Sequence, residues 1–288
     1  MTGRAVQYSL HSLDQGFVEH YDMNSTLSIA ILSGKGGVGK TNITLNLAVA
    51  LHQLGFSPLL IDCDMGLANL DVLLGITPEA NLQDTLLGKT DLAEVLYHLE
   101  DGFDILPAAS GVPELNELKP ELRDILIDRL EPQLSRYDYI FMDLGAGISE
   151  NVQTFAAMSS LRIVIITPEP TSLTDGYALI KVLNNRFGMQ DFMIIVNQAS
   201  SAKEAQNTFE RLQNACLHFL HLEPVLLGHV RRDSKIPEAV CRQQPLLRYA
   251  PGSPAARDIF TMGEKMQRVR LNMADWLAKH GILQRPSR

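Results

Sequence analysis

The sequence predicts an α/β fold in which a mostly parallel, twisted sheet carries helices on both faces. Three observations predict it. Short apolar runs rich in β-branched residues alternate with helical patterns along most of the 288 residues. A glycine-rich loop, "GKGGVGKT", joins the first such run to the first helical pattern. A hydrophobic content of 45% is enough to bury one large core, and the chain shows no internal repeat or low-complexity linker.

The expected strands and helices alternate along the chain. Because the strand-like runs are apolar throughout, we expect strands that are buried on both faces of a parallel sheet. These strands are Leu27–Leu32, Pro58–Ile61, Phe103–Pro107, Tyr139–Met142, Arg162–Thr167, Phe192–Val196 and Val225–Val230. The helices expected between and after them are Thr41–Leu54, Glu121–Leu134, Glu150–Ala157, Ser172–Phe187, Ala202–Phe219 and Ser234–Arg242.

Composition limits the organisation and the class of protein. Residues 1–24 are polar and weakly periodic, so we expect an appendage before a domain at 25–270 and a tail at 271–288. The N-terminus lacks the apolar centre of a secretory signal, and no apolar run approaches the length of a membrane span. The three cysteines are far apart and form no C-x-x-C, which argues against a metal site or a disulfide framework. A net charge of −8 argues against non-specific DNA binding.

The glycine-rich loop predicts a nucleotide site. It fits G-x-x-x-x-G-K-[ST] with Gly34, Gly39, Lys40 and Thr41, and it lies between an expected strand and an expected helix. Such a loop directs backbone N–H groups at phosphate, Lys40 would neutralise the β- and γ-phosphates, and the Thr41 hydroxyl would bind Mg²⁺. The residues expected to contact the nucleotide here are Gly34, Lys35, Gly36, Gly37, Val38, Gly39, Lys40, Thr41 and Asn42.

Three aspartates follow the strands that should flank the loop. Asp62 and Asp64 end the second strand, and Asp143 ends the fourth. Because ligands bind at the carboxyl edge of such sheets, these carboxylates are candidates for holding Mg²⁺ through its waters. The glycines at Gly145 and Gly147 would let the backbone approach a γ-phosphate. Capping of turns is the alternative for any one of the aspartates.

Three motifs together resemble one family. "SGKGGVGKTN", "DCDMGLANLD" and "MDLGAGI" are similar to the deviant Walker A, switch I and switch II motifs of the MinD/ParA family, P-loop NTPases of the SIMIBI type. The resemblance extends from about residue 28 into the 250s. It implies an ATPase that uses ATP and Mg²⁺, forms a homodimer when ATP is bound, and hydrolyses ATP slowly under the control of a partner.

The resemblance also implies roles for individual residues. Lys35 looks like the lysine that reaches the nucleotide of the other subunit, and Lys40 like the lysine of the same subunit. Asp64 would orient the attacking water, Asp143 would be the Walker B carboxylate at the metal, and Asp62 would support the metal site. The family often has Pro or Ala where this chain has glycine directly after Leu144, which should loosen switch II.

Further segments are similar to the parts of the family that surround the ribose and the base. In "TPEPTSLTDGYALIK", Glu169 would lie near the dimer interface and the ribose. In "IIVNQA", Asn197 stands where the family has an adenine-binding Asn, although a simple turn residue is the alternative. In "GHVRRDSKIPEAV", Arg231 and Asp233 would lie beside the base.

Four features favour the flagellar-number regulators of this family, FlhG/FleN, over the division-site MinD proteins. They are Ala68, the segment "DILPAASG", the segment "EPTSLTDGYALIKVLN" and the N-terminal appendage, in which Asp14 and Gln15 weakly resemble a motif that activates the partner GTPase FlhF. The implied partners are an FlhF-like GTPase, a flagellar transcription activator and flagellar switch proteins. Division-site selection and DNA partition stay open as alternatives; an iron–sulfur carrier or reductase would need paired cysteines.

The C-terminal segment carries an apolar stripe. Ile259, Met262, Met266, Val269, Met273 and Trp276 recur at intervals of three and four, with lysines and arginines beside them. We expect the part up to Val269 to pack on the domain and Leu271–Leu283 to be available for an anionic membrane or a partner, which predicts a cytoplasmic protein that binds the inner face of the membrane reversibly. A final helix that faces the core is the alternative. The inserted face would be Met273, Trp276, Leu277, Ile282 and Leu283.

Overall fold

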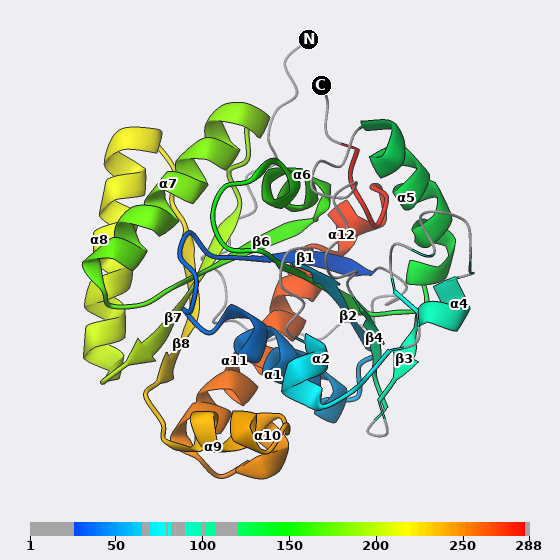
Figure 1. Cartoon of the computed structure of the whole chain (residues 1–288). Helices are drawn as coiled ribbons and strands as arrows, with labels where there is room; N and C mark the ends of the chain where they lie inside the picture. The colour runs from blue at the N-terminus through cyan, green and yellow to red at the C-terminus, as the bar shows by residue number, and fades with distance from the viewer. Residues whose placement is uncertain are drawn as a thin grey trace.

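An eight-stranded sheet forms the centre of the fold, in the order β3-β4-β2-β5-β1-β6-β7-β8 (Figure 1). The computed structural model describes residues 26–64, 70–78, 80, 81, 84, 90, 92–99, 102–107 and 120–285. The predictions for residues 1–24 and for Ala68 lie outside these residues. Within the described part, all adjacent strands are parallel except β3 and β4. The strands are β1 (Leu27–Leu32), β2 (Pro58–Cys63), β3 (Tyr97–His98), β4 (Asp104–Leu106), β5 (Tyr139–Leu144), β6 (Leu161–Ile166), β7 (Phe192–Ala199) and β8 (Val225–Arg231).

Helices cover both faces of the sheet, which confirms the predicted fold class. One face packs against α5 (Pro120–Leu134), α6 (Glu150–Met158), α7 (Pro170–Phe187) and α8 (Ala202–Leu220). The other packs against α1 (Lys40–Gln53), α10 (Leu246–Tyr249), α11 (Pro254–Asn272) and α12 (Ala274–Leu277), with the short helices α2 (Leu70–Leu74) and α9 (Lys235–Cys241) beside them. A further short helix, α4 (Leu92–Val95), lies near the β3 edge (Figure 1).

The central strand shows why the strands are apolar throughout. Leu27, Ile29 and Ile31 of β1 face the cluster of α1 and α11, whereas Ala30 and Leu32 face the cluster of α6 and α7. All five are fully buried. A parallel strand with helices on both sides has no solvent-facing position, so the polar/apolar alternation of a half-exposed strand is absent.

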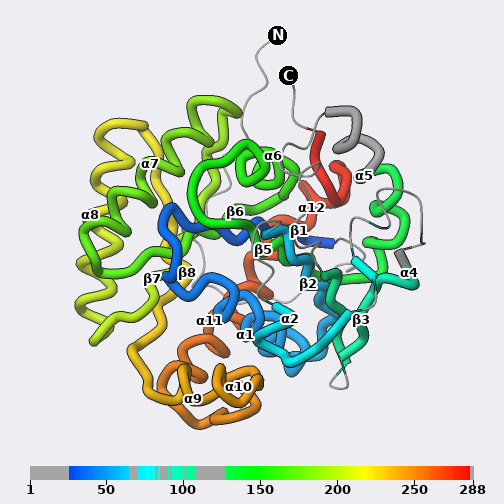
Figure 2. Tube along the Cα trace, viewed as in Figure 1, coloured from blue at the N-terminus to red at the C-terminus, as the bar shows by residue number. Residues whose placement is uncertain are grey.

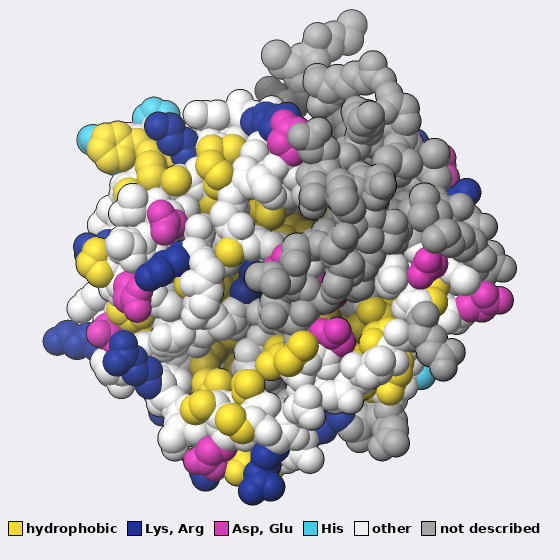
Figure 3. Space-filling model, viewed as in Figure 1, with side chains coloured by type: hydrophobic (Ala, Val, Ile, Leu, Met, Phe, Trp, Pro, Cys, Tyr) yellow, Lys and Arg dark blue, Asp and Glu magenta, His cyan; other side chains and the backbone are white. Residues whose placement is uncertain are grey.

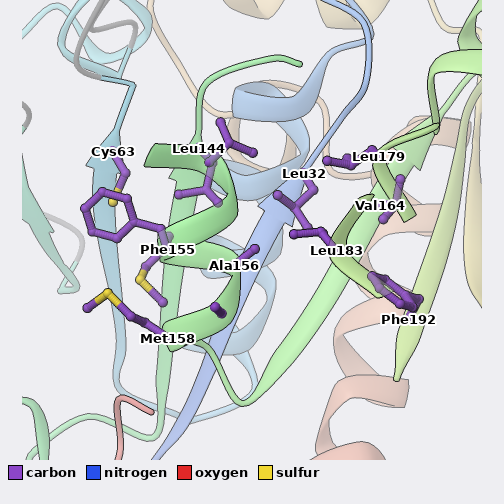
Figure 4. Close-up of a cluster of buried hydrophobic side chains, with 14 of the residues drawn as sticks. Leu32, Cys63, Leu144, Phe155, Ala156, Met158, Val164, Leu179, Leu183 and Phe192 are labelled. Atoms are coloured by element: carbon purple, nitrogen blue, oxygen red, sulfur yellow. The ribbon is translucent and has the colours of Figure 1, made fainter. Parts of the chain in front are cut away.

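The core on the α6 side brings distant segments together (Figure 4). Phe155, Ala156 and Met158 of α6 lie over the sheet, next to Leu144 of β5 and Cys63 of β2. This packing fixes α6, which is joined to β5 by a loop of only five residues. The carboxyl end of β5 is therefore held between packed elements, and the loop to α6 is tied to β1's end by the Gly147 N–H, which donates to the Ser33 carbonyl at 2.9 Å.

The C-terminal segment is buried in this structure, as in the alternative of a final helix that faces the core. Met273 and Leu277 are 8% and 6% exposed and belong to the α1–α11 cluster. Leu283 is 4% exposed and belongs to the opposite cluster. Trp276 and Ile282 are half-buried against the same two clusters. The apolar stripe is buried because the domain itself offers an apolar surface that receives it.

Hydrogen bonds fasten the end of this segment between α5 and α6 (Figure 2). The Ile282 N–H donates to Oε1 of Glu131 in α5, at 2.9 Å. The Ile282 carbonyl accepts from the Ser28 hydroxyl at 2.6 Å, and the Gln284 N–H donates to the carbonyl of Met158 in α6 at 2.7 Å. We call residues 273–285 the C-terminal strap, because they cross the amino edge of the sheet. The part of the stripe from Ile259 to Val269 is buried in α11, as predicted.

Candidate active site

The phosphate-binding loop has a backbone that requires glycine at two positions. A side chain at Gly34 would place its Cβ 2.3 Å from the backbone of Asp175 in α7, so the loop and α7 approach too closely for any other residue. Gly39 has a positive φ of 87°, and a Cβ there would lie 2.5 Å from Nδ2 of Asn197. Gly39 directly precedes α1, whose N-terminus presents backbone N–H groups and partial positive charge to an anion.

Lys40 and Asp143 form a buried ion pair at the carboxyl edge of the sheet. Lys40 Nζ lies 2.9 Å from Asp143 Oδ1, and the two side chains are 8% and 1% exposed. The Thr44 hydroxyl donates to the same oxygen at 3.3 Å. Burying a charge costs free energy unless the charge is paired, so the ion pair offsets the cost of burying each of the two groups. A phosphate group could replace Asp143 as the partner of Lys40. The sequence predicts Lys40 and Asp143 separately, for phosphate and for the metal; their direct contact and the contribution of Thr44 are additions from the structure.

Asp62 organises the chain after β2. One of its oxygens accepts from the Asp64 N–H at 3.0 Å, and the other from the Leu70 N–H at 3.4 Å. Both oxygens therefore bind backbone N–H groups, which is the turn-capping alternative, and the support of the metal site that the resemblance implies for Asp62 stays a prediction. Burial, reinforced by the charges of Asp62 and Asp143, raises the pKa of the Cys63 thiol well above its ordinary value.

The second lysine of the loop binds side chains at the start of α7. Lys35 Nζ lies 2.5 Å from Oε2 of Glu169 and 3.2 Å from Oγ1 of Thr171, at the start of α7. The Lys35 and Glu169 side chains are 39% and 55% exposed, so water screens this pair. The hydrogen bond and the charge from Lys35 lower the pKa of the Glu169 carboxyl. The tip of the loop is open, because side chains at Gly36 and Gly37 would meet nothing within 4 Å.

A cavity of about 250 Å³ opens beside the loop. Its lining combines residues named from the sequence with residues that sequence reasoning misses. The lining residues named from the sequence are Gly39, Asn42, Asn197, Arg231 and Asp233. The ones that sequence reasoning misses are the polar Gln198 and Arg232 and the apolar Ile43, Val230, Ile236, Pro237 and Ile259. Apolar walls with a few polar groups suit a flat heterocycle. The sequence signal for these walls is limited to Ile43 and Ile259, which stand at positions of the helical apolar pattern that are expected to be buried.

Three predicted base-binding residues also have structural partners. The Asn197 amide donates to the Val38 carbonyl at 2.7 Å, and its Oδ1 accepts from the next backbone N–H at 2.8 Å. Asn197 thereby ties the end of β7 to the phosphate loop. The Arg231 guanidinium forms an ion pair with Asp258 in α11, at 2.7 Å.

Asp233 accepts from two backbone N–H groups, those of Lys235 and Ala255, at 2.9 and 3.1 Å. Burial alone would raise the pKa of Asp233, but these hydrogen bonds outweigh it and hold the pKa below its ordinary value. Arg231 and Asp233 therefore shape the rim of the cavity.

The few protein oxygens at this site fit a magnesium ion that is bound together with a nucleotide. Among the described residues, no cluster of three or more His, Cys, Asp or Glu side chains is arranged to hold a metal ion. Mg²⁺ keeps several waters and takes one or two protein oxygens together with phosphate oxygens. The Thr41 hydroxyl at the start of α1 and the Asp143 carboxylate at the end of β5 are the protein oxygens that would hold it.

The family follows from this site and from a sequence match over most of the chain. The family profile described as "Cellulose biosynthesis protein BcsQ" matches residues 27–266. The chain belongs to this family of MinD/ParA-type P-loop ATPases. In structure it is similar to the septum site-determining protein MinD of Pyrococcus horikoshii, solved with Mg-ADP, with a TM-score of 0.69 and 27% identity over 85% of this chain and 97% of that one. MinD in the MinC:MinD complex of Aquifex aeolicus gives a TM-score of 0.70 with 26% identity over 84% and 96% of the two chains.

Curated relatives include two flagellar proteins. "Antiactivator FleN" of Pseudomonas aeruginosa is 37% identical over 244 residues, which are 85% of this chain and 87% of FleN. "Flagellum site-determining protein YlxH" of Helicobacter pylori is 36% identical over 237 residues, or 82% and 80% of the two chains. The family and the loop geometry together make this protein an ATPase with ATP and Mg²⁺ as its cofactors. No helix of the described residues is long and apolar enough to cross a membrane.

Proposed function

We propose that this protein is an ATP-dependent dimerising switch that regulates the number or placement of flagella and reopens when it hydrolyses ATP. The observation that carries the flagellar part is the breadth of the similarity to FleN and YlxH, which covers more than four fifths of this chain. Septum site-determining MinD of Thermotoga maritima is 35% identical, but over only 59% of this chain. The flagellar relatives therefore share more of the molecule.

The position of Lys35 supports the dimerising part. Its ammonium group binds Glu169 and Thr171 of α7 instead of turning into its own phosphate loop, where Lys40 already lies. Because Lys35 and Glu169 are both partly exposed, breaking their ion pair so that Lys35 can bind another partner costs little free energy. The open tip of the loop leaves room for a second subunit. We infer that Lys35 moves from Glu169 to the nucleotide of a partner subunit when two copies close.

The residues of the site would then divide the work of hydrolysis. Bound ATP and Mg²⁺ supply the reactive phosphoryl group and screen its charge. Lys40 exchanges Asp143 for phosphate oxygens, which frees the Asp143 carboxylate to hold the metal. The Asp64 carboxylate accepts a hydrogen bond from a water and orients it. Lys35 of the partner subunit adds positive charge where negative charge develops, so chemistry proceeds only in the closed dimer.

Partners are proposed from the same relatives. The name of FleN as an antiactivator leads us to propose a flagellar transcription activator as one partner, with an FlhF-like GTPase and flagellar switch proteins as others. Peripheral attachment to the inner face of the membrane is a further proposal. If it uses the apolar stripe, it requires the C-terminal strap to leave the clusters that now bury it, because Met273 and Leu277 are not exposed.

DNA partition is the less favoured alternative. It needs a continuous basic surface, since phosphate contacts dominate non-specific DNA binding. On the described part of the face in Figure 3, basic and acidic side chains are interspersed. The net charge of −8 points the same way.

Sedimentation tests the switch directly. With ATP and Mg²⁺ the parental protein should sediment as a dimer, and with ADP as a monomer. Asp64→Ala should bind ATP and accumulate as a dimer, because hydrolysis is what reopens it. In cells, a chromosomal Asp64→Ala allele should change the number or position of flagella. Normal flagellation together with misplaced septa would reject the flagellar role and favour division-site selection.

A further inference from the structure

The end of β7 carries an extra residue relative to its neighbour β8. From Val196 to Ala199 the chain of β7 advances three residues, while β8 advances two, from His229 to Arg231. Because the strands are paired on either side of this point, the extra residue forms a β-bulge at positions 197 and 198. Bulges redirect side chains, and both residues of this one line the cavity beside the phosphate loop.

Gln198 has a left-handed backbone conformation in this bulge. Its φ is 58°, which is uncommon for a residue other than glycine. His221 and Gln243, the other described non-glycine residues with positive φ, lie just after α8 and α9, where this conformation ends a helix. Gln198 instead lies inside β7. A left-handed residue within a strand is the kind of local strain that functional sites hold.

This conformation decides where the peptide groups of Gln198 point. Its N–H donates to Oδ1 of Asn197 at 2.8 Å, and its carbonyl accepts from Nε of Arg232 at 2.9 Å. On the other side of the Asn197 amide, Nδ2 donates to the Val38 carbonyl at 2.7 Å. The amide oxygen must face the N–H and the amide nitrogen must face the carbonyl. These two partners therefore permit only one of the two orientations of the amide.

An amide in one fixed orientation can distinguish adenine from guanine. Each of the two polar atoms of Asn197 keeps one hydrogen-bonding position after these contacts, a second N–H on Nδ2 and a second lone pair on Oδ1. A donor beside an acceptor matches adenine, whose amino group donates next to a ring nitrogen that accepts. Guanine has a carbonyl oxygen in place of that amino group, and in the same pose this oxygen would face Oδ1 and repel it.

We infer that Gln198 is a positioning residue that makes the site select adenine over guanine, because its backbone holds the Asn197 amide in one orientation. The inference rests on the base contact proposed for Asn197, and it requires neither dimerisation nor hydrolysis. The device is the left-handed conformation and not the Gln198 side chain. A β-branched residue at this position would oppose that conformation, whereas asparagine adopts it readily.

The test compares the binding of Mg-ADP and Mg-GDP by titration calorimetry, so that neither the ATP dimer nor hydrolysis contributes. Gln198→Val should reduce the preference for ADP at least about fivefold, since a bidentate contact between an asparagine amide and adenine gives roughly fivefold to hundredfold discrimination. Gln198→Asn should keep the preference within about twofold of the parental value. Gln198→Thr, also β-branched, replaces Gln198→Val if that variant does not fold.

Two comparisons separate positioning from a structural role. His221→Val is the matched control, because it opposes the left-handed conformation at the end of α8 and should lower stability with the ADP preference unchanged. Purine riboside diphosphate lacks the amino group of adenine. The parental protein should bind it at least about fivefold more weakly than ADP, and Gln198→Val should show a smaller difference.

Three outcomes would overturn the inference. One is a parental protein that binds ADP, GDP and purine riboside diphosphate equally. Another is a Gln198→Val protein that binds ADP and GDP more weakly by the same factor, which would make the residue part of the bulge and nothing more. The third is a Gln198→Asn protein that loses the preference as fully as Gln198→Val, because the side chain would then read the base. All three leave the proposed switch standing, and a failed sedimentation test of the switch leaves the ADP preference unaffected.

Discussion

The two edges of the sheet pair their charged and polar groups in different ways. At the carboxyl edge, Lys40 is paired with the carboxylate of Asp143, and Lys35 with that of Glu169. At the amino edge, the buried guanidinium of Arg162 donates to the carbonyls of Ser159, Ser160 and Asp191. A carboxylate partner can be exchanged for a phosphate, whereas a backbone carbonyl is part of the fold. Arg270, also at the amino edge, pairs with the carboxylate of Asp138, so the working site is distinguished by carboxylate partners that lie beside the phosphate loop.

The C-terminal strap belongs to the amino edge and also serves the fold. Its polar contacts join backbone groups of Ile282 and Gln284 to Ser28, Glu131 and Met158. Its apolar residues enter the two existing cores. Every one of these contacts stabilises the chain, and none is at the carboxyl edge where the nucleotide binds. Substitutions at the two edges should therefore separate stability from activity.

The largest effect is expected for Lys40→Ala. It leaves Asp143 buried without its cation, which costs on the order of 3–5 kcal/mol of folding stability, and it removes the positive charge that should hold phosphate. ATP binding should become undetectable by titration calorimetry. Lys35→Ala is the matched control, because it removes an exposed lysine from the same loop and should leave ATP affinity nearly unchanged. Equal loss of ATP binding in both variants would contradict the division of roles between the two lysines.

Arg270→Met should cost nearly as much stability but no ATP affinity. Arg270 is a buried guanidinium that pairs with Asp138 at 2.7 Å and lies over the rings of Phe56 and Tyr139. Because Asp138 is 28% exposed, the expected loss is about 2–3 kcal/mol, at the low end for a buried pair. Urea unfolding measures it, with Lys279→Met as the exposed control. A loss of ATP affinity in folded Arg270→Met would show that the two edges are coupled.

Leu277→Ala tests whether the C-terminal strap is core. It creates a cavity in the cluster shared by α1 and α11, and we expect a loss of about 2 kcal/mol, the low end for a buried leucine because α12 is short and peripheral. Truncation after Val269 should unfold the domain. A truncated protein that stays folded, binds ATP and loses only its binding to anionic vesicles would restore the prediction of a membrane-binding tail.

The smallest effect is expected for Ser28→Ala. Its hydroxyl is fully buried, donates to the Ile282 carbonyl and accepts from the Ser160 N–H at 3.0 Å. Removing it should cost about 1–2 kcal/mol, because two buried groups lose a partner. Ser135→Ala is the control, since that serine is exposed and its hydroxyl binds only a neighbouring carbonyl. Thermal unfolding should separate the two variants, and equal melting temperatures would show that the strap adds nothing at this point.

The sequence predicts the carboxyl edge well because its signals are local. Apolar runs locate seven of the strands, the spacing of the loop locates Lys40 before the first helix, and the end of an apolar run locates Asp143 at the same edge of the sheet. The strand β3 and the helices α2, α4 and α10 escape prediction because two to five residues carry no usable periodicity. Asp62 is ambiguous, since capping of a turn and binding of a metal require the same residue at the same place.

The amino edge is harder to predict because its partners are distant in sequence. An apolar stripe such as Met273, Trp276 and Leu277 fits a membrane and a protein core equally well. The difference is the receiving surface, which is built from α1, α5, α6 and the start of β1 and cannot be read from the stripe itself. Asn197 shows the same limit at the loop, because its bond to Val38 spans 159 residues.

The trans role of Lys35 is the central claim, and mixing two defective variants tests it most directly. Lys35→Ala keeps its own Lys40 and Asp64, while Asp64→Ala keeps Lys35. A mixed dimer therefore has one complete site only if Lys35 acts on the nucleotide of the other subunit. An equal mixture should recover up to about a quarter of the parental ATPase rate, since about half of random dimers are mixed and each has one working site. A mixture as inactive as its components would show that Lys35 acts within its own subunit.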